Sequence, residues 1–393
     1  MDDKPNPPGT VAPQDISIVR GGPFYRIQRA FGLIRPGQWN LGRRITLLVA
    51  VGWLSPFLIT AILNPGGLQS FVRDYRVSSR MLIAVPALLI AEYLMELRFR
   101  AVMRHIREAG LLDASDLALM DDTIAKLARA RNSFLPELTV ILILFLHSVM
   151  SYRGLVDATP WLASGTPPDL QLTAAGKYTI LVSASIFQFL LGLALWNWLL
   201  WTFFAFKLSR RNLKLIPTHP DGHGGLGFLG LTASAFAPVA FAATAVIGAT
   251  WRQDILHHHA HLIDYKLPAI FLLVIVVLVA FGPLVFFVPR LSALRRKAIL
   301  EYGILGQIHS AEFHEKWILH RAGHESEFLE APDSSSLTDY CSSFEKIERL
   351  QPFLADKGAL YTLAASVAIP ALPAIVAEIP IVVVLQDLLK ALR

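Results

Sequence analysis

The chain is poor in cysteine and in charge. Cys341 is the only cysteine among its 393 residues, so no disulfide can form within one chain. Aspartate, glutamate, lysine and arginine together make up only 17% of the residues, and the mean hydropathy is +0.48. A typical soluble domain is about 25% charged. These values therefore exclude an ordinary soluble globular protein.

Recognisable catalytic motifs are also lacking. We find no G-x-S-x-G, H-E-x-x-H or Walker A sequence, and no cysteine–histidine pair with the spacing of a nucleophile and its base. Gly225-Leu-Gly-Phe-Leu-Gly230 fits G-x-G-x-x-G, but a dinucleotide fingerprint follows a β-strand, whereas a long apolar segment precedes this one. The sequence therefore favours a protein that is not an enzyme, and it specifies no cofactor.

A cleaved signal peptide is not evident either. Residues 1–22 are polar and proline-rich, without an apolar core, and we expect them to be disordered. Residues 23–44 mix five arginines with aromatic side chains, which is typical of a segment that lies in the headgroup region of a bilayer. The first apolar segment is then expected to act as the insertion signal.

Long apolar blocks are abundant. Hydrophobic residues make up 54% of the chain, and many blocks approach the roughly 20 residues that cross a bilayer as a helix. The blocks are residues 45–63, 81–99, 135–151, 178–206, 228–250, 267–288 and 359–386. We therefore predict an all-α, polytopic membrane protein of about seven transmembrane helices, with the lipid bilayer as its surroundings.

The loops between these blocks predict an orientation. Lysine and arginine concentrate in the N-terminal flank and in three loops, 100–134, 207–227 and 289–297. Two loops on the other side are poor in them, although 64–80 carries three arginines. By the positive-inside rule, the N-terminus and the three basic loops face the cytoplasm of a bacterial inner membrane. The net charge of +6 then reflects loops near anionic lipid, and we expect no nucleic-acid partner.

One basic loop carries an amphipathic pattern. Within residues 100–134, the apolar positions Leu117, Met120, Ile124 and Leu127 follow a 3-4-3 spacing, which is typical of one face of a helix. Such a helix needs a partner surface, and a cytoplasmic protein is one candidate for it.

The C-terminal part continues the helical pattern. Residues 45–288 hold the first six spans, and residues 289–358 follow them without an initial helix breaker, so we predict a cytoplasmic helical segment packed beneath the bundle. Residues 359–393 form the last span and a tail. Pro370, Pro373 and Pro380 interrupt that span, which favours a kinked helix over a re-entrant hairpin.

Several short motifs resemble those of one bacterial family of multi-pass membrane proteins. The motifs are Phe187-Gln-Phe-Leu-Leu, Pro217-Thr-His-Pro-Asp-x-x-Gly-Gly-Leu-Gly-Phe-Leu-Gly230, Phe281-Gly-Pro-Leu-Val-Phe-x-x-Pro-Arg, Glu301-Tyr-Gly and Phe313-x-x-Lys-Trp317. The resemblance covers most of the chain. It implies a multi-pass architecture, but no established activity comes with the family.

The stretch from His219 to Gly230 supports three interpretations. Pro220 and Asp221-Gly222 favour a tight structural turn. Free N–H groups of a glycine-rich turn at a helix N-terminus also bind anions. The residues of such an anion site would be Arg211, Lys214, His219, Asp221, Gly222, Gly224, Gly225 and Gly227. The third interpretation is a metal site formed by His219, Asp221 and His223.

Carboxylates inside apolar blocks are the second group of candidates. Glu92 and Glu96 lie one helical turn apart in the second block, and Glu378 lies among the prolines of the last one. Charged groups in a span are costly and usually face a bundle interior or water. Each could bind a transported proton or cation. Glu92 and Glu378 could instead pair with a buried arginine or a neighbouring helix, and Glu96, near the basic end of its block, is more simply explained by an interfacial ion pair.

A histidine-rich loop is a weak candidate for metal. Asp254, His257, His258 and His261 have the spacing to share a helix face and could bind zinc or copper. A solvated loop is the interpretation that the sequence favours.

These features leave three functions open. A channel or transporter for an ion or small solute is favoured by the carboxylates and the broken last span. A sensor or assembly protein would instead bind a cytoplasmic partner through its helices, and either type could form homo-oligomers. A metal-dependent membrane enzyme is the third.

Overall fold

The computed structural model describes residues 17, 19–35, 38–143, 159–165, 171–257, 260–319 and 332–378 of the chain. Within these residues the protein is almost entirely helical, and the one sheet is an antiparallel pairing of β1 (Ala163–Ser164) with β2 (Gln171–Leu172). The prediction of an all-α protein is therefore confirmed.

The helices merge into longer units. Turns of 3-10 or π helix join them into continuous helical stretches over 41–63, 75–108, 174–209, 227–257 and 262–319, and residues 135–143 are helical as well. The α-helical segments are α1 (Gly22–Ala30), α2 (Leu41–Val49), α3 (Ser55–Leu63), α4 (Leu68–Val72), α5 (Tyr75–Ser78), α6 (Val85–Glu108), α7 (Ala114–Asn132), α9 (Ala174–Tyr178), α10 (Ala184–Ser209), α11 (Ala237–His257), α12 (Lys266–Phe281), α13 (Val288–His314), α14 (Pro332–Glu348) and α15 (Lys357–Glu378).

Short acidic residues fix where helices begin. The Asp74 carboxylate accepts the N–H of Arg76 at 2.9 Å and starts α5. The Asp356 carboxylate accepts the N–H of Ala359 at 2.7 Å at the start of α15. Each caps a backbone donor that the first turn of a helix leaves without an internal partner.

Five helices of the described residues are long and apolar enough to cross a membrane. They are Leu41–Leu63, Ala174–Ser209, Gly227–His257, Leu262–Leu319 and Lys357–Glu378. The chain therefore has the composition and helix lengths of a membrane protein, but the predicted count of about seven spans is not confirmed.

The two other predicted spans, 81–99 and 135–151, are not among these five helices, for two different reasons. Residues 81–99 are helical. The helix that contains them carries several charged side chains and is not among the described helices that are apolar enough to cross a membrane. Residues 135–143 are helical, and the rest of the predicted span 135–151 lies outside the described residues.

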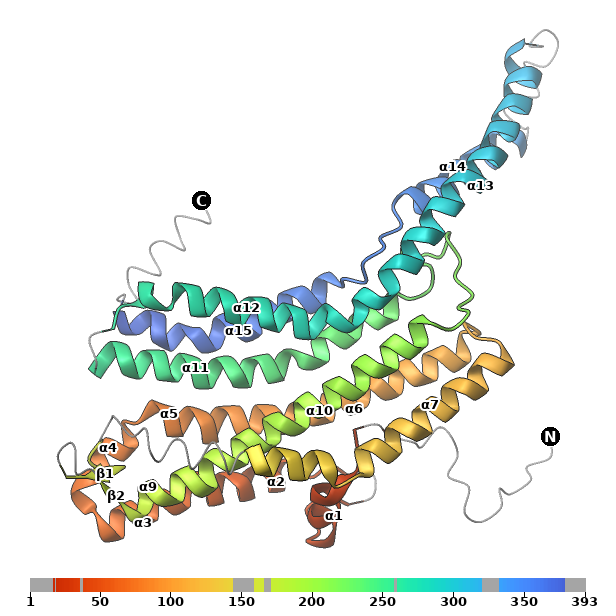
Figure 1. Cartoon of the computed structure of the whole chain (residues 1–393). Coiled ribbons are helices and arrows are strands. Elements are labelled where there is room, and N and C mark those ends of the chain that lie inside the picture. The colour runs from red at the N-terminus through yellow and green to blue at the C-terminus, as the bar shows by residue number, and fades with distance from the viewer. Residues whose placement is uncertain are drawn as a thin grey trace, which may run out of the picture.

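The long helices are arranged in two layers. Helices α11, α12 and α15 run side by side, and α2, α3, α6 and α10 lie on the other side of α11 (Figure 1). Helix α6 contacts both α10 and α11. The core at this junction includes Phe99 of α6 stacked on Trp201 of α10, with ring centroids 4.6 Å apart.

Close contact between α11 and α15 depends on Gly248. A Cβ atom at this position would lie 2.9 Å from the carbonyl oxygen of Pro370 and 3.5 Å from Cα of Ala371. A small residue lets two helix backbones approach each other in this way. Helix α15 continues through Pro370 and Pro373, so its described part is one helix and not a hairpin; Pro380 lies outside the described residues.

The amphipathic stripe of α7 packs against the protein itself. Met120, Ile124 and Leu127 are buried in the main core, and Leu117 packs against its edge. Helix α7 and residues 211–226 belong to two of the basic loops, 100–134 and 207–227, and we call the end of the molecule that carries them the basic end. The predicted need for a partner surface at α7 is therefore met within the chain.

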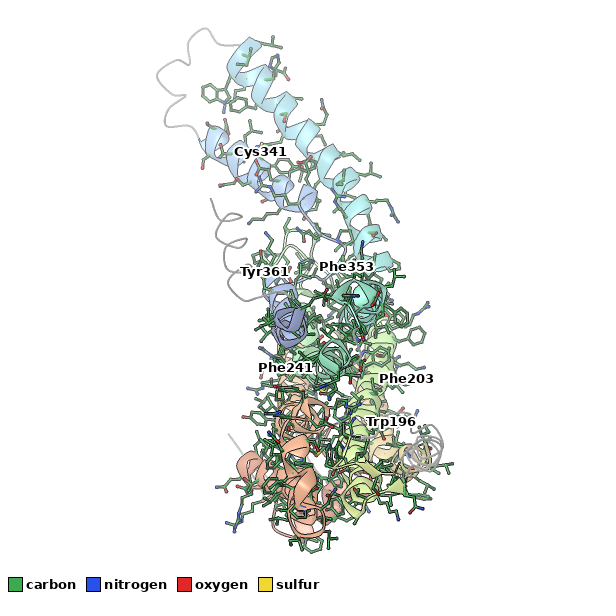
Figure 2. The ribbon with its side chains drawn as sticks, turned by 90° about the vertical axis from the view of Figure 1, so that its left-hand side faces the viewer. Trp196, Phe203, Phe241, Cys341, Phe353 and Tyr361 are labelled. Carbon is green, nitrogen blue, oxygen red and sulfur yellow. The ribbon has the colours of Figure 1, made fainter. Side chains whose placement is uncertain are left out.

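The middle of the predicted cytoplasmic segment 289–358 does not pack beneath the bundle, whereas its two ends do, with Leu291, Leu350 and Leu354 buried in the main core. Helix α13 leaves the bundle at the basic end and projects beyond it, with α14 lying back along it (Figure 1). Viewed at right angles, the α13–α14 pair rises clear of the helix bundle, with the exposed Cys341 on α14 (Figure 2). We refer to this pair as the projecting hairpin.

Candidate functional site

The glycine-rich turn at residues 219–227 is occupied by the side-chain carboxylate of Asp221. Oδ1 of Asp221 accepts the N–H groups of His223 at 2.8 Å and Gly225 at 3.1 Å, and Oδ2 accepts the N–H of Gly227 at 2.8 Å. Burial raises the pKa of Asp221. The hydrogen bonds from these three N–H groups and from the His219 side chain together lower it by more, so the pKa lies below its ordinary value.

The turn needs glycine for its backbone shape. Gly222, Gly224 and Gly225 have φ angles of 68°, 64° and 95°, in the left-handed region that other residues avoid. Because these conformations direct the following N–H groups toward one point, the sequence prediction of an anion-binding turn has a physical basis. In the structure, however, the Asp221 carboxylate occupies the donors of Gly225 and Gly227.

The same turn fastens the segment between α14 and α15. Gln351 donates its N–H to the Gly222 carbonyl at 2.9 Å, and its own carbonyl lies 2.9 Å from Nδ1 of His223. A Cβ at Gly230 would lie 3.1 Å from the carbonyl oxygen of Leu354. These contacts favour the interpretation of the stretch as a structural turn.

Two predicted anion ligands are directed to other partners. Nζ of Lys214 lies 2.6 Å from Oδ1 of Asp113, and Nη1 of Arg211 lies 3.8 Å from Oδ1 of Asp116. The Lys214 N–H also donates to the Leu111 carbonyl at 2.9 Å. Arg211 and Lys214 thus tie the segment after α10 to the first turn of α7 and to the turn that precedes it.

The predicted metal sites are not assembled. Among the described residues, no group of three or more histidine, cysteine, aspartate or glutamate side chains could hold a metal ion. Nδ1 of His219 lies 2.8 Å from Oδ1 of Asp221, but the Nδ1 atom of His223 is directed to Gln351.

The second metal candidate, in the histidine-rich loop, is dispersed. Asp254 accepts the Tyr265 hydroxyl at 3.1 Å, His261 lies beside Glu378, and His257 is exposed at the end of α11. His258 lies outside the described residues.

Glu92 forms a pair with a buried arginine. Its Oε2 atom lies 2.6 Å from Nη2 of Arg44, whose side chain is 1% exposed against 18% for Glu92. Nε of Arg44 also donates to Oε1 of Gln28 at 2.5 Å. Of the roles that the sequence left open for Glu92, the geometry favours that of partner to a buried arginine.

Glu96 holds the N-terminal segment against α6. Its buried carboxylate pairs with Arg100 on the next turn and lies 3.4 Å from Nε of Arg20. The Ser17 hydroxyl donates to its other oxygen at 2.5 Å. Ser17, Arg20 and the buried Val19 belong to the stretch predicted to be disordered, and here they are held by contacts.

A third glutamate, which the sequence analysis did not single out, completes this network. Glu137 accepts the Phe24 N–H at 2.9 Å and lies 3.8 Å from Nη1 of the buried Arg131. Arg131 also donates from Nε to the carbonyl of Val19 at 2.9 Å. Arg131 sits within the predicted α7 pattern, but nothing in its local sequence indicates a partner 112 positions away.

Glu378 is separate from the other carboxylates. It is the last residue of α15, whose end lies on the side of the bundle opposite α7 (Figure 1). It accepts the Leu262 N–H and lies 3.4 Å from Nδ1 of His261. Its contacts are therefore those of a cap that holds the start of the 262–265 turn.

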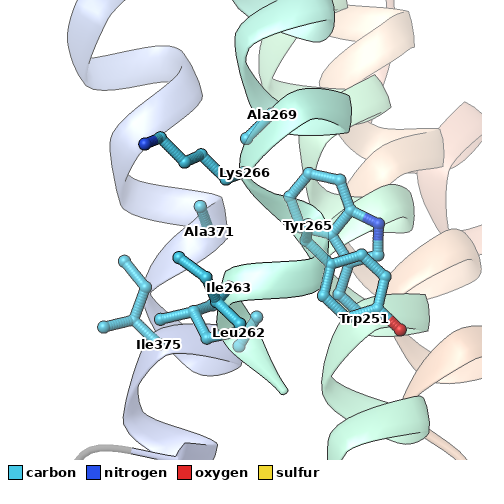
Figure 3. Close-up of a pocket in the computed structure, with 9 residues that line it drawn as sticks. Trp251, Leu262, Ile263, Tyr265, Lys266, Ala269, Ala371 and Ile375 are labelled. Carbon is cyan, nitrogen blue, oxygen red and sulfur yellow. The ribbon is translucent and has the colours of Figure 1, made fainter. Parts of the chain in front are cut away.

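A cavity of about 460 Å³ lies beside this turn, between α12 and α15. Apolar side chains of the 262–265 turn and of α15, including Ile263 and Ile375, line it (Figure 3). Lys266 is the charged residue of its lining. Glu378 is not part of this lining, so the cavity and the carboxylate do not form a shared site.

The projecting hairpin carries a row of apolar side chains that is exposed among the described residues. Leu300, Ile304 and Ile308, spaced four residues apart on α13, are 70%, 66% and 51% exposed. At about 100° per residue they lie on a different face from His309, which contacts α14 through Ser336 at 3.1 Å. We call these three residues the α13 stripe.

Polar contacts hold the hairpin together. Nζ of Lys316 and Nε1 of Trp317 contact Oδ2 of Asp333, at 2.5 Å and 3.2 Å. The Lys316 ammonium is the first cause of the lowered pKa of Asp333. The Tyr340 hydroxyl donates to the Tyr302 carbonyl. The hairpin therefore presents the α13 stripe on a braced pair of helices.

Comparison with known proteins returned no match: no protein-family model, curated protein or solved structure corresponds to this chain. The family resemblance carried by the short motifs stays a prediction.

Proposed function

We propose that the chain is a docking or assembly protein of a bacterial inner membrane. Its basic end faces the cytoplasm, as the distribution of lysine and arginine predicts. The projecting hairpin then reaches into the cytoplasm and binds a protein partner that presents a helix with an apolar face. The observation that carries this proposal is the exposure of the α13 stripe on a helix that continues directly from the bundle.

The surroundings of the stripe support a protein partner. Exposed apolar residues at four-residue spacing are the pattern by which amphipathic helices recognise each other. Lys297 and Glu301, which lie 3.6 Å apart beside the stripe, add charges of both signs. A mixed polar rim around an apolar centre is the usual composition of a protein interface.

Site-specific photo-crosslinking tests this proposal. A photoreactive amino acid replaces Ile304 in one variant and Ser310, exposed on another face of α13, in the matched control. We expect the probe at 304, but not at 310, to capture one discrete cytoplasmic protein in intact cells. We also expect Ile304→Asp with Ile308→Asp to lower its co-purification about tenfold, since a few central apolar residues dominate most interfaces.

The outcomes separate the alternatives. A crosslink between two copies of the chain would make the stripe a homo-oligomer interface and would replace the proposed partner. Equal capture at positions 304 and 310, or none at either, would contradict the proposal.

Transport through the embedded carboxylates is the second candidate. The observation that favours it is the buried Glu92–Arg44 pair, because ion pairs inside membrane proteins also occur along proton and ion pathways. In proteoliposomes, this function predicts a proton or cation flux that Glu92→Gln abolishes. The absence of flux in the unaltered protein would remove this candidate.

A further inference from the structure

A cavity of about 510 Å³ lies between α1 and the first turns of α2, and Arg44 and Gln28, the residues in contact beside Glu92, form part of its wall. Its volume falls within the range of roughly 300–1,000 Å³ that is usual for small-molecule pockets. Six apolar side chains form most of its wall: Phe24, Ile27, Phe31, Leu33, Leu47 and Leu48. The rest of the lining is Arg44 and Gln28.

The two polar residues of the wall keep unused hydrogen-bond donors. Arg44 is 1% exposed and Gln28 is 5% exposed. Arg44 uses Nε toward Gln28 and Nη2 toward Glu92. Among the described residues, neither Nη1 of Arg44 nor Nε2 of Gln28 has an acceptor, and both atoms are buried. Buried donors are rarely left without a partner, so this pair indicates a ligand that supplies acceptor oxygens.

The charge around the cavity favours an anion. Arg44, the charged residue of the lining, belongs to a region whose ion pairs join four arginines, Arg20, Arg44, Arg100 and Arg131, to three glutamates, Glu92, Glu96 and Glu137. Four positive and three negative charges leave one positive charge in excess. A water molecule could accept the two hydrogen bonds, but it would neither balance this charge nor cover the apolar wall.

The mouth of the cavity is apolar. Ile27, Phe31 and Leu47 are 53%, 78% and 43% exposed. Ile27 lies on α1, Phe31 directly follows that helix, and Leu47 lies on α2, at the junction between the predicted headgroup segment and the first candidate span. A ligand with an acyl chain therefore has an apolar route to the buried donors.

We propose that this cavity binds an amphipathic anion: an acyl chain whose acidic head, a carboxylate or a phosphate, accepts hydrogen bonds from Arg44 and Gln28. A free fatty acid and an anionic phospholipid share this chemistry. The proposal is independent of the docking function, because the cavity lies on α1 and α2 and the stripe lies on α13.

The test uses the purified full-length protein in nanodiscs and three photoactivatable probes with the same acyl chain. The probes are a fatty acid, phosphatidylglycerol and phosphatidylcholine, and labelled peptides are mapped by mass spectrometry. Leu47→Trp fills the cavity, and Leu58→Trp is the matched control, a similarly exposed leucine on α3 outside the lining. Gln28→Leu removes one donor, and circular dichroism with gel filtration verifies the fold of each variant.

We expect a probe with an acidic head to label the peptides of residues 22–48. Labelling should fall about tenfold in Leu47→Trp, by several-fold in Gln28→Leu and not at all in Leu58→Trp, since hydrogen bonds to charged groups and pocket volume both contribute to binding. Competition with the unlabelled fatty acid distinguishes a free carboxylate ligand from a phospholipid. Equal labelling by phosphatidylcholine, labelling spread over all spans, or identical labelling of all folded variants would overturn the proposal.

Discussion

The pair between Arg44 and Glu92 should stabilise the fold measurably. Arg44 is almost fully buried, and Glu92 is its one carboxylate partner in the described ion pairs. Replacing Glu92 by leucine leaves a buried charge without compensation, which typically costs about 3–5 kcal/mol. Because Glu92 keeps 18% exposure and Gln28 still accepts from Arg44, we expect the lower end of that range, about 3 kcal/mol.

A double-mutant cycle measures this contribution. The free energy of unfolding in detergent is compared for Glu92→Leu, Arg44→Met and the double variant, with Leu58→Ala as a control at an exposed apolar position. Replacing both charges by apolar groups removes the uncompensated charge, so the double variant should be more stable than Glu92→Leu. We expect a coupling of about 1–3 kcal/mol. Additive effects, or a double variant less stable than both single variants, would refute the reasoning.

Two further predictions concern the turn and the helix contact. Asp221→Asn should destabilise the protein by about 1–3 kcal/mol at neutral pH, since it loses charge-assisted hydrogen bonds. The pKa of Asp221 is lower in the folded state, so the carboxylate contributes to the free energy of unfolding above the unfolded pKa of about 3.9 and loses this contribution as the pH falls through the folded pKa. The free energy of unfolding should therefore depend less on pH in the acid range for Asp221→Asn than for the unaltered protein. Gly248→Leu should cost about 1–3 kcal/mol by separating α11 from α15, whereas Gly303→Leu, where an added Cβ meets nothing within 4 Å, should leave the thermal midpoint unchanged or higher. An unchanged midpoint for Gly248→Leu would contradict the close-approach role of this glycine.

Local sequence patterns predicted what depends on local structure. The stripe of α7 and the glycine-rich turn both follow from residue spacing and backbone preference, and both are present. Hydropathy also identified a helical membrane protein. It did not settle the number of spans, because a helix such as α6 can carry charged residues that its neighbours compensate, and composition alone does not record that compensation.

The partners of the buried charges could not be predicted. Arg44 and Glu92 are 48 positions apart, and Arg131 and Val19 are 112 apart. Apolar surface in a membrane protein faces either lipid or other helices, so hydropathy does not show which helices touch. The projecting hairpin illustrates the same limit: its helices were predicted, but not their position outside the bundle.

The fastening of Gln351 to the glycine-rich turn has a mechanical consequence. Helix α13 is 27 residues long, or about 40 Å, and its companion α14 returns to the bundle through the segment that holds Gln351. A displacement of the hairpin can therefore pass back to the bundle. If α13 and α14 moved sideways, the two contacts that join Gln351 to Gly222 and His223 would carry the load, and the motion would reach α15 through this segment.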